Sequence, residues 1–150
     1  SEKYKFQLMS FFSKNKKKDM KNNNDFFCKV ASLLIHAAKI DEVYTDDEKE
    51  IIKKTLIKLG AEDLNIDRII SEATTIEENS NQILNFTREV KNAPESLKIE
   101  IVEALWKIIY SNKNADIYET NLMRRLTGLL YIDSKIIGNI KEKVKKEFFK

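Results

Sequence analysis

The side chains best suited to chemistry in this sequence are the carboxylates of one short polar stretch, Asp41–Glu48. Five acidic residues fall within these eight positions, with no basic residue among them. Divalent cations such as Ca²⁺ bind about six to eight oxygen ligands at flexible geometry, and clustered carboxylates can supply them. The D-x-D-x-D-G pattern of an EF-hand loop is absent, so the stretch predicts only a weak cation site. Its expected ligands are Asp41, Asp46, Asp47 and Glu48.

The same acidic residues have a purely structural explanation. Thr45 and Glu48 have the spacing of a capping box, in which the short side chain accepts a hydrogen bond from a helix amide and the glutamate reaches back. Carboxylates in the first turn of a helix also stabilise the helix dipole. This interpretation needs no ligand, and the sequence leaves both interpretations open.

The acidic stretch belongs to an internal repeat. Residues Val30–Gly60, here called copy one, align with Ile101–Tyr131, called copy two, at an offset of 71 residues. Each copy reads as an apolar helix, a short polar loop and an amphipathic helix, and a repeat of this length sets the architecture. The offset pairs Leu34 with Leu105, Asp41 with Asn112, Thr45 with Asp116, and Glu48 with Glu119.

The loop of copy two is the weaker candidate for a cation. Its equivalent residues are Asn112, Asp116 and Glu119, so an amide replaces the first carboxylate, and Lys113 adds a positive charge. Asp116 and Glu119 also have the spacing of a capping box. We therefore expect any cation to bind to copy one.

Helical spacing of apolar residues and terminal signals predict an all-α fold of about seven helices. No segment alternates in the manner of a strand. The predicted helices run from Asn24 or Asp25 to Lys39, from Thr45 to Gly60, over 66–77, over 81–91 after a Ser80 cap, over Pro94–Tyr110, over Asp116–Leu130, and onward from a cap at Asp133 or Ser134.

The two apolar helices of the repeat, Asp25–Lys39 and Pro94–Tyr110, are expected to pack centrally around a pseudo-two-fold axis. The second of these is apolar nearly all round, which is typical of a helix covered on several sides. We expect Trp106 in the core for this reason. Gly128 and Gly138 lie inside predicted helices, where glycine costs about 1 kcal/mol relative to alanine, so they predict close helix–helix approach.

Residues 1–24 form a basic N-terminal arm before a single helical domain at 25–150. The arm holds seven lysines against two acidic residues, a net charge of +5 within a chain of net +3. Its apolar segment, Tyr4–Ser13, is predicted to form a short N-terminal helix or a tail, and Lys14–Asn24 reads as a linker. One interpretation is a solvated linker. The other is contact with a partner or an anionic membrane surface, through Phe11, Phe12, Lys16, Lys17 and Lys18.

Several classes of function are disfavoured. His36 is the only histidine and falls on a polar helix face, so we expect it to be exposed and inert. Cys28 has no histidine at an obvious position, so nucleophilic catalysis is not expected either. No glycine cluster could cradle phosphate. The basic runs Lys14–Lys18 and Lys141–Lys146 lack a helix-turn-helix signature, so nucleic acid is not an expected partner. A single cysteine, no apolar signal core and no long apolar run predict a cytoplasmic setting.

Two segments carry a resemblance to a known family. AAKIDEVYTDDEKEII resembles the first signature, A-x-x-D-G-x-x-x-x-x-E, of TerB-like tellurite-resistance domains. ALWKIIYSNKNADIYETNLMRRLTGLLYI resembles the second signature, with its W, Y-E and R-R-L-x-x-L-L. The likeness covers about residues 25–148. In this chain Glu42 and Lys113 stand where the family has glycine, and Asn112 departs from its aspartate.

The resemblance implies a seven-helix fold, a divalent-cation site at the acidic loops, and a role in metal or stress response. Related domains include the N-terminal domain of a membrane-anchored co-chaperone. The sequence therefore predicts a non-enzymatic, cytoplasmic TerB-like module that binds an unidentified partner protein and, weakly, Ca²⁺ or another divalent cation. The alternative is a co-chaperone-like or membrane-surface adaptor, peripheral to the membrane, that uses the arm at residues 1–24.

Overall fold

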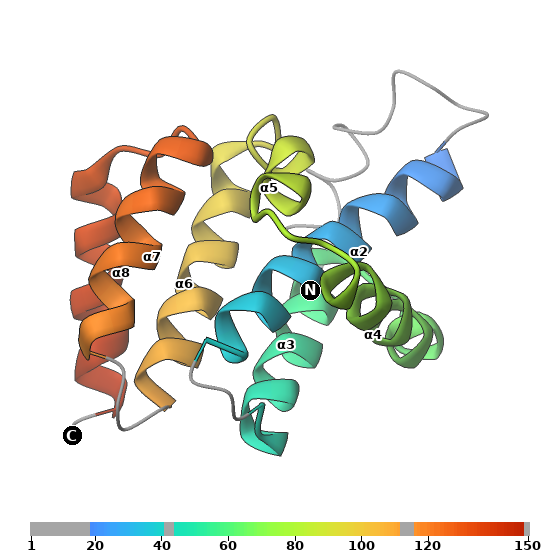
Figure 1. The fold of residues 1–150 in the computed structure, drawn as a ribbon, viewed down its shortest axis with the longest axis horizontal. Helices are drawn as coiled ribbons and strands as arrows, with labels where there is room; N and C mark the ends of the chain where they lie inside the picture. Colours follow the sequence, from blue (N-terminus) through green and yellow to red (C-terminus); the bar gives the residue numbers. More distant parts are fainter. Residues whose placement is uncertain (1–18, 41–43, 112–115, 149–150) are drawn as a thin grey trace.

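Seven α-helices and no strand make up the described part of the chain in the computed structural model (Figure 1). The structure describes residues 19–40, 44–111 and 116–148, with side chains from residue 24 onward except at 116–120. The predicted all-α fold is confirmed. The helices are α2 (Asp19–Ala38), α3 (Asp46–Leu59), α4 (Asp63–Glu78), α5 (Leu84–Val90), α6 (Glu95–Ser111), α7 (Asp116–Leu129) and α8 (Ser134–Phe148).

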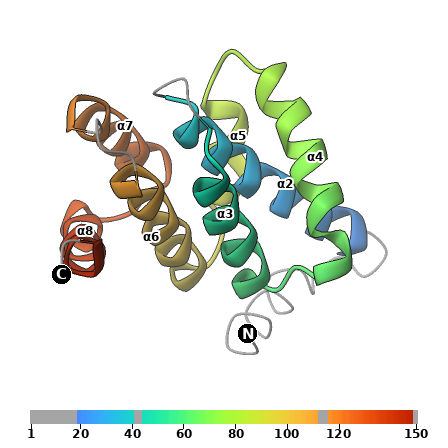
Figure 2. The same cartoon turned by 90° about the horizontal axis from the view of Figure 1, so that it is seen from below.

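Helices α2 and α6 form the centre of the bundle, as their apolar sequences predict. α2 packs against α3, α4, α5 and α6, whereas α6 packs against α2, α3 and α8. In Figure 2, α3 and α6 lie side by side, with α4 on one flank of the molecule and α7 and α8 on the other. Leu34 and Leu105, equivalent in the repeat, are both fully buried. Trp106 is also in the core, and its indole Nε1 donates to the carbonyl of Ile137 at 3.2 Å.

The repeat is longer than predicted from the sequence, because α4 and α8 also correspond at the 71-residue offset. Each follows the amphipathic helix of its copy and packs against the central helix, α4 on α2 and α8 on α6. Their buried positions coincide under the same offset: Ile66 with Ile137, Ile69 with Ile140, and Ala73 with Val144. The duplicated unit therefore comprises at least three helices, α2–α4 and α6–α8.

The turn after the second helix of each unit is also duplicated. Gly60 has φ 115° and Tyr131, its equivalent, has φ 54°, and these are the two positive φ angles among the described residues. In both turns the next amide donates to a carbonyl five residues earlier, as in a Schellman motif. These bonds join Ala61 to Leu56 at 2.9 Å and Ile132 to Thr127 at 3.4 Å. Both copies therefore leave the helix with the same backbone geometry.

Helix starts differ from the predictions by three residues or more in three places, and one of them is α4, which begins at Asp63 rather than at 66. α2 begins at Asp19, so the predicted linker Lys14–Asn24 is wrong for its second half. The run 19–24 contains asparagine, a weak helix former, but no glycine or proline to break the helix. α5 begins at Leu84 without a side-chain cap, and Ser80 Oγ instead accepts from Asn85 Nδ2 at 2.9 Å.

The explanation offered for two glycines is also wrong. A Cβ atom added at Gly128 or Gly138 would meet no atom within 4 Å beyond its own stretch of helix, so no other helix approaches closely at either position. The position of a glycine within a helix fixes its face, but it does not show whether another helix packs against that face. By contrast, the predicted start of α8 is confirmed, because Asp133 Oδ1 accepts from the amide of Lys135 at 2.9 Å.

Candidate functional site

The acidic residues before α3 form the predicted capping box. Thr45 Oγ1 accepts from the Glu48 amide at 3.1 Å, and Glu48 Oε1 accepts from the Thr45 amide at 2.9 Å and from Thr45 Oγ1 at 3.0 Å. Glu48 is only 2% exposed. The capping interpretation is therefore confirmed in copy one, and the Glu48 carboxylate faces the helix end rather than solvent.

The other three expected cation ligands, Asp41, Asp46 and Asp47, take no part in the hydrogen bonds described for the capping box. Asp46 and Asp47 are exposed in the first turn of α3, while Asp41 lies outside the described residues. Within the part of the chain that the structure describes, no three His, Cys, Asp or Glu side chains are grouped so as to hold a metal ion. The cation site stays a prediction, in which Asp41, Asp46 and Asp47 have to supply most of the ligands.

Tyr44 borders this loop and has a buried hydroxyl. Its Oη has no hydrogen-bond partner among the described residues. Burial, and then the negative charge of Glu48, raise the pKa of Tyr44 to about 12. The phenol therefore stays neutral and supplies no anionic ligand to a cation.

The other residues singled out by the sequence fall largely outside the described structure. Asn112 in copy two is among them, and the side chains of Asp116 and Glu119 are likewise not described, although both residues belong to α7. The expected contact residues of the arm also precede the described chain: Phe11, Phe12, Lys16, Lys17 and Lys18.

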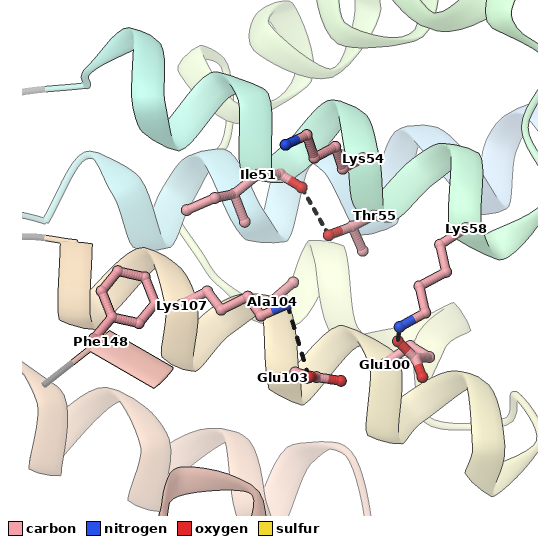
Figure 3. Close-up of a pocket in the computed structure, with 9 residues that line it drawn as sticks. All are labelled: Ile51, Lys54, Thr55, Lys58, Glu100, Glu103, Ala104, Lys107 and Phe148. Atoms are coloured by element: carbon pink, nitrogen blue, oxygen red, sulfur yellow. Dashed lines mark hydrogen bonds and ion pairs between the residues drawn. The ribbon is translucent and has the colours of Figure 1, made fainter. Parts of the chain in front are cut away.

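A groove that was not predicted from the sequence lies between α3 and α6, with the end of α8 at one edge (Figure 3). We call it the α3–α6 groove. Its volume is about 300 Å³. Three lysines, two glutamates and four less polar side chains line it: Ile51, Lys54, Thr55, Lys58, Glu100, Glu103, Ala104, Lys107 and Phe148.

Both glutamates of the groove are buried on α6, and both are paired with lysines. Glu100 is 7% exposed and lies 2.8 Å from Lys58 of α3. Glu103 is 6% exposed and lies 3.2 Å from Lys143 of α8 and 3.7 Å from Lys107. Buried charges are tolerated when they are paired in this way. The hydrogen bond to Glu100 raises the pKa of Lys58, so this lysine stays charged.

Lys54 also lines the groove. It is exposed and has no ion-pair partner among the described residues. The three lysines and two glutamates that line the groove give it a net charge of +1, and the charge of Glu147 on α8 also acts on Lys58. One sequence signal could have indicated it. Glu100, Glu103 and Lys107 interrupt the apolar surface of α6 at spacings of three and four, which places them along one face.

Two titratable residues of α2, His36 and Cys28, are bonded to glutamates of α4. His36 is half-buried rather than exposed as expected, with Nδ1 3.4 Å from Glu77, which also pairs with Lys39 at 2.8 Å. Cys28 is buried, and its Sγ donates to a carboxylate oxygen of Glu72 at 3.3 Å. Burial, and then that bond, raise the pKa of Cys28 to about 12, so its thiol is not a nucleophile at neutral pH.

An all-helical duplicated bundle with a capped acidic loop in copy one defines a class of helical domain rather than a known enzyme fold. The family model described as tellurite resistance protein TerB matches residues 28–142 of the chain. The protein therefore belongs to the TerB family, and the resemblance noted in the sequence is confirmed. Searches of curated proteins and of solved structures found no match.

None of the described helices is long and apolar enough to cross a membrane.

Proposed function

We propose that this chain is a non-enzymatic TerB-like module that binds a partner protein in the α3–α6 groove, as part of a metal or stress response. The observation that carries the proposal is the groove itself. It is concave, has a net positive charge, and combines lysines with the less polar Ile51, Ala104 and Phe148. Binding surfaces commonly join an apolar centre to a polar rim in this way.

The shape and charge of the groove indicate the chemistry of the partner. A groove between two helices accommodates a third amphipathic helix, whose apolar side chains enter between them. Glu100 and Glu103 are already paired with lysines. The charge that a partner protein would meet in the groove is therefore the positive charge of Lys54. The partner segment is therefore a short amphipathic helix with acidic residues beside its apolar face.

Titration with a synthetic peptide tests this proposal. The probe is a 12-residue amphipathic peptide with leucines on one helical face and glutamates beside them, and the matched control peptide has lysines in place of the glutamates. The acidic peptide should perturb NMR signals of α3 and α6 in the full chain, and the basic peptide should not. Lys54→Glu should weaken binding of the acidic peptide, whereas Lys49→Glu, exposed elsewhere on α3, should have a smaller effect.

Equal binding of both peptides, or shifts spread over other helices, would refute this site. An equal loss of affinity in the Lys54→Glu and Lys49→Glu variants would show that peptide binding depends on the net charge of the protein and not on the groove. Calorimetry at two salt concentrations separates these cases, because interactions between exposed charges are screened by salt whereas apolar burial is not.

A further inference from the structure

The outer helices α4 and α8 occupy equivalent places in the repeat but carry opposite charge. α4 holds five acidic residues and one basic residue, whereas α8 holds five lysines and two glutamates. The two helices lie on opposite flanks of the molecule (Figure 2). The described domain therefore has an acidic flank at α4 and a basic flank at α8.

Part of this charge is used within the molecule, and part of it faces outward. Glu77 of α4 and Lys143 of α8 form ion pairs with other segments of the same chain. By contrast, Glu78 of α4 and Lys135 and Lys146 of α8 are exposed. These three side chains have no ion-pair partner among the described residues, so they are available to a second molecule.

The exposed charges of the two helices have the same spacing. Asp67 and Glu78 are 11 residues apart on α4, and Lys135 and Lys146 are 11 residues apart on α8. Eleven residues make about three helical turns, or about 16 Å, so each pair lies along one face of its helix. Asp67 contacts Lys53 at 3.6 Å, but its side chain is 92% exposed and can also meet a lysine of another molecule.

A residue of the opposite sign on each helix distinguishes between the two possible orientations. Arg68 is the one basic residue of α4, and Glu142 is an exposed acidic residue of α8. If the two acidic residues of α4 face the two lysines in antiparallel order, Arg68 lies within one helical turn of Glu142. In parallel order the same two residues are nearly two turns apart. The charges are therefore complementary in the antiparallel arrangement.

We propose that copies of this chain associate head to tail, with the exposed face of α4 in one copy packed antiparallel on the exposed face of α8 in the next. Because the two faces lie on opposite flanks, a copy bound through α4 keeps its own α8 free. The contact is thus heterologous and produces open chains of molecules rather than a closed dimer. Leu64, which is 93% exposed and lies one turn before Arg68, adds apolar surface to the α4 face.

This association is weak and depends on salt, because exposed ion pairs contribute little individually and are screened by ions. It goes beyond the proposed function and does not depend on the α3–α6 groove.

Sedimentation velocity of the full chain measures the association. The mean sedimentation coefficient should rise with protein concentration, up to about 1 mM, in about 20 mM salt, and it should stay constant in about 0.5 M salt. A coefficient that is independent of concentration at low salt would overturn the proposal. So would a rise that stops at the value of a dimer, because the contact would then be closed.

Charge reversal tests which faces meet. One variant carries Asp67→Lys and Glu78→Lys on α4, and the other carries Lys135→Glu and Lys146→Glu on α8. All four positions are exposed, so both variants should fold. Each variant alone should lose about tenfold or more in its association constant. An equimolar mixture should recover the association, because each reversed face is complementary to a face of the other variant. A mixture that does not recover would refute the proposed contact.

A control variant separates the α8 face from the net charge of the protein. Lys49→Glu with Lys54→Glu changes the net charge as much as the α8 variant does, at two exposed positions of α3, and it should leave the association unchanged. An equal loss in this control would refute the proposal. If association is lost on reversal of α4 but survives reversal of α8, the basic N-terminal arm contacts α4 instead, and the proposal is wrong.

Discussion

Removing the capping box of α3 should destabilise the protein without any cation present. The informative changes are Thr45→Ala, Glu48→Ala and, as a control, Asp47→Ala. Thr45 Oγ1 makes two of the three hydrogen bonds of the box, and Glu48 takes part in all three. Asp47 lies in the same turn but is exposed and makes none of these bonds.

The expected magnitudes follow from these contacts. Loss of an N-cap side chain costs about 1 kcal/mol, within a range of about 0.5–2 kcal/mol. Glu48→Ala also leaves the Thr45 amide without its carboxylate partner, and such a loss costs about 1–3 kcal/mol. Asp47→Ala removes only an interaction with the helix dipole, worth about 0.3–1 kcal/mol. The predicted order of destabilisation is Glu48→Ala, then Thr45→Ala, then Asp47→Ala.

Thermal and urea denaturation in buffer with a chelator measure this order. A loss of 1 kcal/mol corresponds to about 2–4 °C in Tm for a domain of this size. The capping explanation would be refuted if the denaturation midpoint were unmoved by Thr45→Ala. It would also fail if Asp47→Ala lowered the free energy of unfolding as much as Glu48→Ala in the absence of metal. Asp46, Asp47 and Glu48 would then act as one electrostatic cluster.

Three further predictions concern other parts of the molecule. Gly60→Ala should lower the free energy of unfolding by about 1–2 kcal/mol, because alanine is strained at the φ of 115° that Gly60 adopts. Tyr131→Gly should change it by less than about 1 kcal/mol, because the relief of backbone strain at φ 54° is offset by loss of the contact between the Tyr131 ring and Lys91. Equal losses of stability in urea denaturation would contradict this. Cys28, with a pKa of about 12 against 9.0 for a free thiol, should be alkylated far more slowly in the native than in the unfolded protein; its contribution to stability is complete below pH 9 and is lost as the pH rises from 9 towards 12. If the loop 41–48 binds Ca²⁺ with a Kd of about 10⁻⁴–10⁻³ M, 10 mM Ca²⁺ should stabilise the chain by about 1.4–2.7 kcal/mol and shift NMR signals of residues 41–48; shifts centred on 112–119, or none, would reject the site.

The sequence by itself determined the helices, the central place of α2 and α6, the capping box and the family. These features are local or periodic. A capping box joins residues three apart, an apolar stripe recurs with the helical period, and Gly60 ends α3 through its own backbone freedom. The 71-residue repeat was also visible, although α4 and α8 were not recognised as part of it because their resemblance lies in buried positions rather than in identical residues.

Only the tertiary structure decided which polar residues are buried and what they meet. Glu103 is a buried carboxylate because Lys143, forty positions later in the chain, reaches it from α8. His36 is half-buried because Glu77 and Phe86 arrive from two other helices. Helical periodicity places a residue on a face of its own helix, but the neighbour of that face depends on how the helices pack. For that reason the α3–α6 groove, with its paired charges, became visible only in the folded chain.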